Sequence, residues 1–151
     1  MSQAAHDVMS KKLITIAMGT TASRALQIME QYRIRHLPVV DQKSVVVGVV
    51  TKQDLIDGDL FVELFMSSPV EYMDQDTTLQ RVIFKMLEKK ISCILVGNDE
   101  DDAVGIVTTS DLLWYLAYLL GKETEKHQTL WNIVNLRTIG EVARSLSDIG
   151  I

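Results

Sequence analysis

Two pairs of residues in this chain combine a hydroxyl and a carboxylate at the same spacing. Thr51 lies three residues before Asp54, and Thr108 lies three residues before Asp111. A threonine hydroxyl can donate a hydrogen bond to a phosphate oxygen, and a carboxylate can accept two from the vicinal hydroxyls of a ribose. Each pair therefore suits a nucleotide. The same Thr-x-x-Asp pattern before an apolar residue is also a capping pattern, which satisfies helix N–H groups without a ligand.

Both pairs lie in a longer segment that the chain repeats. Residues 48–55 return as residues 105–112, which is an offset of 57 residues, and the same offset aligns Met9 with Met66 without a gap. Each segment describes a buried strand that leads into a helix N-terminus, where free N–H groups and the helix dipole favour anions. A period of this length, present twice, predicts two copies of one supersecondary unit packed as a pseudo-symmetric pair.

The first copy predicts the order strand, helix, strand, strand, helix. A break at Gly19 and a hydroxyl N-cap at Thr20 and Thr21 begin the first helix. Pro38 predicts either that its strand lies at the edge of the sheet or that Pro38 itself lies near the start of the strand. The expected elements are a strand over 13–16, a helix with the apolar stripe Ala22, Ala25, Leu26 and Met29, a hairpin of strands 37–41 and 45–50 joined by 42–44, and a short helix that Thr51 caps and that runs through Asp54 and Leu55.

The second copy predicts the same order. Thr77 and Gln80 form a capping box before its first helix. The acidic turn over 98–102 lacks the spaced ligands and central glycine of a calcium loop, so we interpret it as a solvated hairpin tip. The expected elements are a strand over 70–73, a helix with the apolar stripe Leu79, Val82, Ile83, Met86 and Leu87, and a hairpin of strands 92–96 and 103–107.

Composition favours one soluble globular module. The chain has 151 residues, of which 47% are hydrophobic and 23% are charged. A net charge of -5 makes nucleic acid an unexpected partner and gives no attraction to anionic membranes.

The single Cys93 forms no disulfide within the chain, and residues 1–12 lack the apolar stretch of a signal peptide. The apolar run over 112–120 is far shorter than the ~20 residues of a membrane span. We therefore expect a cytoplasmic protein.

The sequence contains no pattern typical of an enzyme. It shows no nucleophile with a base and no carboxylate pair of a catalytic cleft. His6, His36 and His127 have no ligand-like spacing to one another or to Cys93, so we expect no built-in metal site. Cys93 lies among apolar residues and is interpreted as a buried small hydrophobe.

The repeated elements resemble the cystathionine-β-synthase (CBS) domain pair, also called a Bateman module. The resemblance covers residues 7–120 and rests on residues 8–10, on Thr20 and Thr21, on residues 34–41 and on the two Gly-to-Asp segments. It implies an α/β (α+β) fold of two pseudo-twofold-related β-α-β-β-α repeats packed sheet to sheet. The expected parts are residues 1–62 for the first repeat, 63–121 for the second and 122–151 for a C-terminal helical extension.

The resemblance also implies two clefts, each with a Thr and an Asp from one repeat and first-strand residues from the other. In the first cleft Asp111 would hold the ribose, and in the second His36 would lie near the phosphates. The first cleft would take Lys12, Leu13, Ile14, Ile34, Arg35, Thr108, Ser110 and Asp111. The second would take His36, Thr51, Gln53, Asp54, Pro69, Val70, Ile91 and Ser92.

The two clefts differ in their side chains. Gln53 replaces the additional hydroxyl that Ser110 supplies, and the second repeat has Ser92 and Cys93 where the first has Arg35 and His36. These two basic residues are interpreted either as phosphate ligands or as solvated or capping groups at a strand edge. We expect Asp111, rather than Asp54, to be the stronger ribose contact.

The family implies a homodimeric regulatory module that needs no cofactor. It would bind AMP, ADP, ATP or S-adenosylmethionine and signal to a protein in trans, because no catalytic domain is attached. The alternative is a ligand-free scaffold or oligomerisation module of the same fold. Residues 129–149 predict a further helix, with a capping box of Thr138 and Glu141, that packs on its own domain or a twin subunit or docks a regulated partner.

Overall fold

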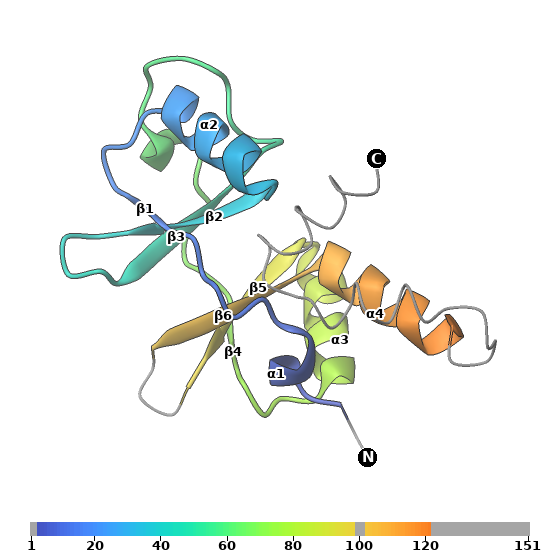
Figure 1. The fold of residues 1–151 in the computed structure, drawn as a ribbon. Helices are drawn as coiled ribbons and strands as arrows, with labels where there is room; N and C mark the ends of the chain where they lie inside the picture. The colour runs from blue at the N-terminus through green and yellow to red at the C-terminus, as the bar shows by residue number, and fades with distance from the viewer. Residues whose placement is uncertain (1–2, 99–101, 122–151) are drawn as a thin grey trace. The chain divides into compact units, whose positions relative to one another are not determined.

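The structure is a computed structural model that describes residues 3–98 and 102–121. The chain forms two compact units, which we call unit 1 (Met1–Leu13 and Tyr72–Ile151) and unit 2 (Ile14–Glu71). Each unit combines a three-stranded sheet with helices (Figure 1). The mixed α and β fold predicted from the sequence is therefore confirmed.

Unit 2 contains the elements of the first repeat. Its strands are β1 (Ile16–Ala17), β2 (His36–Val40) and β3 (Val46–Thr51), with β1 parallel to β2 and β2 antiparallel to β3. Helix α2 (Ala22–Tyr32) begins after Thr21, whose Oγ1 accepts a hydrogen bond from the Arg24 N–H at 3.3 Å. A 3-10 helix, η1 (Val62–Leu64), comes after the last strand. The predicted helix start and hairpin are thus confirmed.

Unit 1 contains the elements of the second repeat and a short helix before them. Its elements are α1 (Ala5–Val8), β4 (Tyr72–Asp74), α3 (Leu79–Lys89), β5 (Cys93–Gly97), β6 (Ala103–Thr108) and α4 (Thr109–Gly121). Strand β4 is parallel to β5, and β5 is antiparallel to β6. The sequence analysis missed α1, in which Ala5 and Val8 are buried and Asp7 accepts a hydrogen bond from the Ala4 N–H.

The internal repeat is reproduced in the structure at the same offset. Helix α2 becomes α3, β2 becomes β5 and β3 becomes β6, each 57 residues later in the sequence. Both helices end on a left-handed residue, Arg33 and Lys90, each with φ of 53°. The repeated sequence therefore encodes the same local backbone twice.

One predicted element is absent from unit 2, because the chain after Thr51 forms a turn and not a helix. In unit 1 the equivalent segment continues as the 13-residue helix α4. The difference arises from the next residues, because Asp57, Gly58 and Asp59 have low helix propensity and favour turns. The prediction of a helix through Asp54 and Leu55 was wrong.

Several smaller predictions are also corrected. The N-cap of α3 is Thr78 and not Thr77, and it makes no side-chain capping bond. The Gln3 carbonyl instead accepts the hydrogen bond from the Leu79 N–H at 2.7 Å. On α3, Ile83 and Leu87 are exposed, so the buried stripe is narrower than expected. The first strands are β1 and β4 as bounded above, later than the expected 13–16 and 70–73.

Pro38 lies in the central strand of its sheet and not in an edge strand. It is near the start of β2, where β3 pairs with it on one side, and the pairing with β1 begins only at Val39. Its missing N–H is therefore tolerated before the strand becomes fully paired. Of the two positions that the sequence allowed for Pro38, the start of the strand is confirmed.

The segment that precedes each repeat in sequence packs in the unit of the other repeat. In unit 1, Val8 and Met9 join the core of α3, β5 and β6. In unit 2, Met66 packs against the core that contains Met29, Leu37 and Val50. The boundaries of the compact units thus differ from those of the sequence repeats, and the repeat boundaries at 62 and 121 remain a prediction. The helix expected over 129–149 and the centre of the acidic turn lie outside the described residues.

Candidate functional site

The two Thr-x-x-Asp pairs lie at equivalent ends of the two hairpins. Thr51 is the last residue of β3, opposite His36, and Thr108 is the last residue of β6, opposite Cys93. We call these places the Thr51 end and the Thr108 end. The antiparallel pairing fixes the position of each threonine, and the turn or helix after it fixes its aspartate.

At the Thr51 end, the carboxylate is exposed and its bonds are local. The Thr51 hydroxyl donates to Asp54 Oδ2 at 2.6 Å, and the Asp54 N–H donates to Thr51 Oγ1 at 3.3 Å. The Lys52 N–H donates to the Arg35 carbonyl at 2.8 Å. The aspartate therefore lies at the surface, within a turn that is bonded to Arg35, the residue before strand β2.

At the Thr108 end, the carboxylate caps a helix. Asp111 is only 8% exposed, and its Oδ2 accepts hydrogen bonds from the Thr108 N–H at 2.8 Å and from the Thr108 hydroxyl at 3.0 Å. The Asp111 N–H donates in return to Thr108 Oγ1 at 3.3 Å. This reciprocal arrangement is a capping box, so the pattern performs at least the structural role that the sequence allowed for it.

The glycine of each repeated segment is required for close packing. A Cβ on Gly48 would lie 2.5 Å from Met66 Sδ, and a Cβ on Gly105 would lie 2.6 Å from Met9 Sδ. The chain next to each methionine pairs with the strand, because Ser67 bridges to Val49 and Ser10 bridges to Ile106. Sequence analysis missed this contact, although the offset that aligns Met9 with Met66 was its signal.

His36 and Cys93 occupy the same place in their strands but differ in charge. Burial lowers the pKa of His36 from its usual value, Arg35 lowers it further, and Asp54 acts in the opposite direction. Burial raises the pKa of the Cys93 thiol to about 11. Cys93 is therefore a neutral thiol at physiological pH and not an activated nucleophile. It is half-buried, and so less buried than the sequence predicted.

The residues of each predicted cleft are divided between the units. The backbone brings Arg35 to the Thr51 end, and it brings Ser92 to the Thr108 end, where the Ser92 carbonyl accepts a hydrogen bond from the Thr109 N–H at 3.0 Å. The cleft assignments thus remain a prediction. Unit 2 contains Ile14, Ile34, Arg35, His36, Thr51, Gln53, Asp54, Pro69 and Val70, and unit 1 contains Lys12, Leu13, Ile91, Ser92, Thr108, Ser110 and Asp111.

Within residues 3–98 and 102–121, no group of three or more His, Cys, Asp or Glu side chains lies close enough to hold a metal ion. None of the helices in the same part of the chain has the length and apolar character that crossing a bilayer requires.

A pair of repeated α+β units, each with a Thr-x-x-Asp end, identifies the family. The CBS domain model matches this chain twice, over residues 5–61 and 58–118. The chain therefore belongs to the CBS domain family, as a tandem pair, and the resemblance noted from the sequence is confirmed.

Solved structures with this fold include complexes with adenosyl compounds. The CBS domain pair of protein MJ0100, in complex with 5'-methylthioadenosine and S-adenosyl-L-methionine, has a TM-score of 0.71 and 28% identity, covering 82% of this chain and 100% of that one. The cytosolic domain of the Mg2+ channel MgtE, in complex with ATP, has a TM-score of 0.64 and 27% identity, covering 74% and 48%.

Curated relatives that are at least 30% identical to this chain include much longer proteins. Inosine-5'-monophosphate dehydrogenase of Methanocaldococcus jannaschii is 30% identical over 112 residues, which cover 72% of this chain and 23% of the enzyme. The chain thus spans less than a quarter of that relative's length, and the similarity does not carry the enzyme's activity to it.

Proposed function

We propose that this chain is a regulatory module that binds an adenosine nucleotide or a related adenosyl compound and passes a conformational change to another chain. The observation that carries the proposal is the Thr-x-x-Asp pair at the same strand end of both repeats. Complexes of CBS-pair relatives with 5'-methylthioadenosine, S-adenosyl-L-methionine and ATP support it.

The chemistry of the ends supports an adenosyl ligand. Asp54 is exposed at a strand end, where its carboxylate can accept hydrogen bonds from the vicinal hydroxyls of a ribose. The Thr108 end begins helix α4, whose dipole favours an anionic group beside the hydroxyls of Thr109 and Ser110. We keep the two ligand sets of the resemblance as the proposed clefts, with Arg35 and His36 as the basic residues.

Calorimetric titration of the full chain with 5'-methylthioadenosine, S-adenosylmethionine, AMP, ADP and ATP tests this proposal. We expect at least one of them to bind. The variants Asp54→Asn and Asp111→Asn should each lose about 1.5 to 3 kcal/mol at their own cleft, because a charge-assisted hydrogen bond to the ribose is removed. Such a loss is roughly a ten- to a hundredfold weaker affinity.

A matched control is Asp41→Asn, which removes the same charge from the opposite end of the β2–β3 hairpin. Asp41 is in the hairpin connection, where its Oδ1 accepts hydrogen bonds from the Lys43 and Val45 N–H groups. Its substitution should leave the affinity unchanged. Equal affinities for wild type and for both variants at the strand ends would remove these aspartates from the site.

The signalling part of the proposal is tested separately. A ligand shifts a conformational equilibrium only through its different affinities for the two states. We therefore expect small-angle scattering or hydrogen exchange to change at saturating ligand. Unchanged profiles, together with measured binding, would contradict signalling and leave binding intact.

The second candidate function is a ligand-free scaffold of the same fold. The capping box of Thr108 and Asp111 favours it, because these bonds give both residues a structural role without any ligand. The absence of binding by every compound in the titration would favour this candidate. The homodimer, the partner in trans and the cytoplasmic location remain predictions under either function.

A further inference from the structure

Unit 2 exposes large apolar side chains on the segment that replaces a helix. This segment, residues 56–64, comes shortly after the Thr51 end. It contains Ile56 (69% exposed), Leu60 (56%), Phe61 (53%) and Leu64 (70%). Single exposed apolar residues are ordinary, whereas four of them on one nine-residue segment make that segment a candidate interaction surface.

The 56–64 segment is bonded closely to the start of α2. The Ala22 N–H donates to the Leu60 carbonyl at 2.8 Å, and the Val62 N–H donates to the Thr20 carbonyl at 2.9 Å. Val62 is fully buried in the core of unit 2. The backbone is thus anchored on both sides of Phe61, so the neighbouring apolar side chains are presented from a fixed support.

A second anchor lies at the first part of the segment. The Ser23 N–H donates to the Gly58 carbonyl at 3.0 Å, and the Ser23 hydroxyl donates to Asp57 Oδ1 at 2.6 Å. The Gly58 N–H donates back to Ser23 Oγ at 3.0 Å. Because these bonds fix both parts of the segment, binding a partner there requires little ordering of the backbone.

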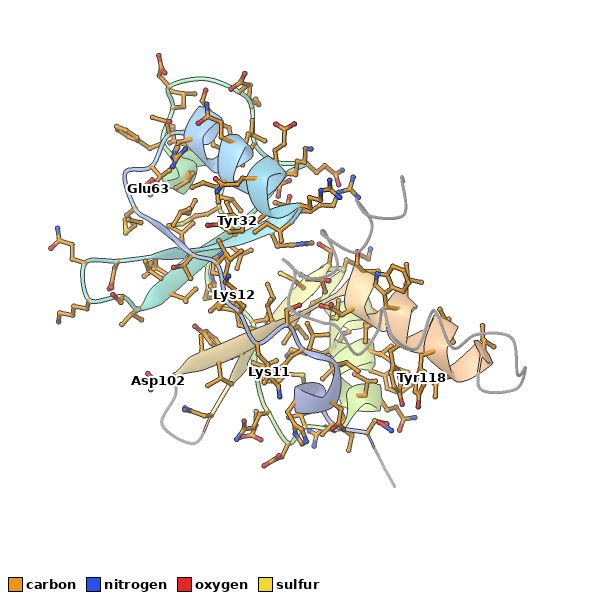
Figure 2. The ribbon with its side chains drawn as sticks, in the orientation of Figure 1. Lys11, Lys12, Tyr32, Glu63, Asp102 and Tyr118 are labelled. Atoms are coloured by element: carbon orange, nitrogen blue, oxygen red, sulfur yellow. The ribbon has the colours of Figure 1, made fainter. Side chains whose placement is uncertain are left out.

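The charge of the 56–64 segment is entirely acidic. It contains Asp57, Asp59 and Glu63 and no basic residue. Glu63 lies in η1 beside the chain that enters α2 (Figure 2), where its Oε1 accepts the Gly19 N–H at 2.7 Å. Its Oε2 is buried and has no hydrogen-bond partner among the described residues. Glu63 therefore holds the segment against the chain before α2, and the exposed charges of the segment are those of Asp57 and Asp59.

These charges distinguish between possible partners. A second copy docked through its own 56–64 segment, with the twofold axis at this segment, would bring acidic side chains together, which is repulsive. Nucleic acid and anionic lipid are disfavoured for the same reason. Helix α3 of unit 1 also exposes apolar residues, Phe84 and Leu87, but Lys85 and Lys89 lie among them. The 56–64 segment, in contrast to α3, combines its exposed apolar group with acidic side chains alone.

We propose that the 56–64 segment is a docking surface for a protein partner that presents Lys or Arg side chains beside apolar ones. The apolar side chains of the partner pack on Phe61 and Leu64, and its basic side chains pair with the exposed Asp57 and Asp59. This inference extends the proposed regulatory function by giving the chemistry of the regulated chain.

The test uses the full chain without nucleotide and a labelled peptide of about 15 residues built from Leu and Lys in an amphipathic helical pattern. We expect fluorescence anisotropy to show binding that weakens with salt. The double variant Phe61→Ser/Leu64→Ser should bind the peptide at least about tenfold more weakly, as for central interface residues. Asp59→Asn removes one exposed negative charge from the segment and should weaken binding about fivefold.

The matched control is Phe84→Ser/Leu87→Ser on α3, which removes the same residue types at the same spacing and similar exposure. It should bind the peptide as wild type does, and a peptide with Glu in place of Lys should not bind. Thermal unfolding checks that both double variants are folded.

The proposal is wrong if wild type does not bind the peptide or if both double variants bind equally well. It is also wrong if Phe61→Ser/Leu64→Ser dissociates a homodimer in sedimentation, because a second copy then covers this surface. Because no nucleotide is present, these outcomes leave the proposed ligand binding unaffected.

Discussion

The Thr51 end and the Thr108 end share residue types and backbone but differ in the structure of the next segment. The Thr51 end continues into a turn with an exposed aspartate, whereas the Thr108 end begins a 13-residue helix whose buried aspartate caps it. The difference arises a few residues later, where Asp57, Gly58 and Asp59 stand in place of Trp114, Tyr115 and Leu116. One motif can therefore cap a helix in one repeat and expose a carboxylate at the surface in the other.

Substitution of the equivalent glycines should give the largest change in the free energy of unfolding, and it compares the packing of the two repeats directly. In Gly105→Ala the new Cβ would lie 2.9 Å from the Ser10 carbonyl oxygen, so the paired backbone must move. We expect a loss of about 3 kcal/mol in the free energy of unfolding, measured by urea denaturation. Gly48→Ala should lose less, about 2 kcal/mol, because its nearest backbone atom is 3.1 Å away and the flexible Met66 side chain can shift.

Gly97→Ala is the control for these variants. Its Cβ would lie 3.6 Å from the Asp102 carbonyl oxygen, which is an ordinary contact, so the free energy of unfolding should change by about 0.5 kcal/mol or less. If Gly97→Ala and Gly105→Ala were equally stable, then Gly105 would not be required for the close packing of Met9.

Substitution of the two aspartates should change the free energy of unfolding by less than the glycine variants do, and by different amounts at the two ends. Asp111→Ala removes a capping box and should lower the free energy of unfolding by about 1 to 2 kcal/mol, whereas Asp54→Ala at the exposed turn should lower it by about 0.5 kcal/mol or less. Thermal and urea unfolding without ligand measure both changes. Equal losses would mean that the helix after Thr108 does not distinguish the ends.

The smallest effect should be a pH dependence that comes from His36, which stands where the second repeat has Cys93. The folded structure lowers the pKa of His36, chiefly through burial and then through Arg35. The unfolded chain therefore takes up a proton at His36 more readily, so the stability from this group is present above pH 6.5 and is lost as the pH falls. In His36→Gln, the decline of the unfolding free energy between pH 7 and pH 5 should be less steep than in wild type.

The control for this pH dependence is Cys93→Ser, at the equivalent place in β5. Because the pKa of Cys93 is about 11, the thiol stays uncharged over this pH range. Its substitution should therefore leave the slope of stability against pH unchanged, whatever it does to stability itself. A slope that His36→Gln does not alter would mean that His36 titrates in the folded chain as it does in the unfolded one.

Sequence patterns predicted the repeated core well, because each of its elements is set by local residues. The Thr21 cap and the stripe of Ala22, Ala25 and Met29 are sufficient to define α2. The prediction of a helix after Thr51 was wrong because the helix-breaking residues a few positions later outweigh the capping residues. The exposure of Leu87 could not be predicted, since periodicity alone does not give the width of the buried face.

The sequence by itself determined the duplication, the family and the two Thr-x-x-Asp pairs, because these depend on residue types and their offset. Tertiary structure decided which segments complete each core. The chain around Met9 packs with the second repeat, and the chain around Met66 packs with the first, because the glycine opposite each methionine leaves room for its sulfur. It also decided that Asp111 is buried in a capping box while Asp54 stays exposed, since that depends on the segment after each strand end and on its packing.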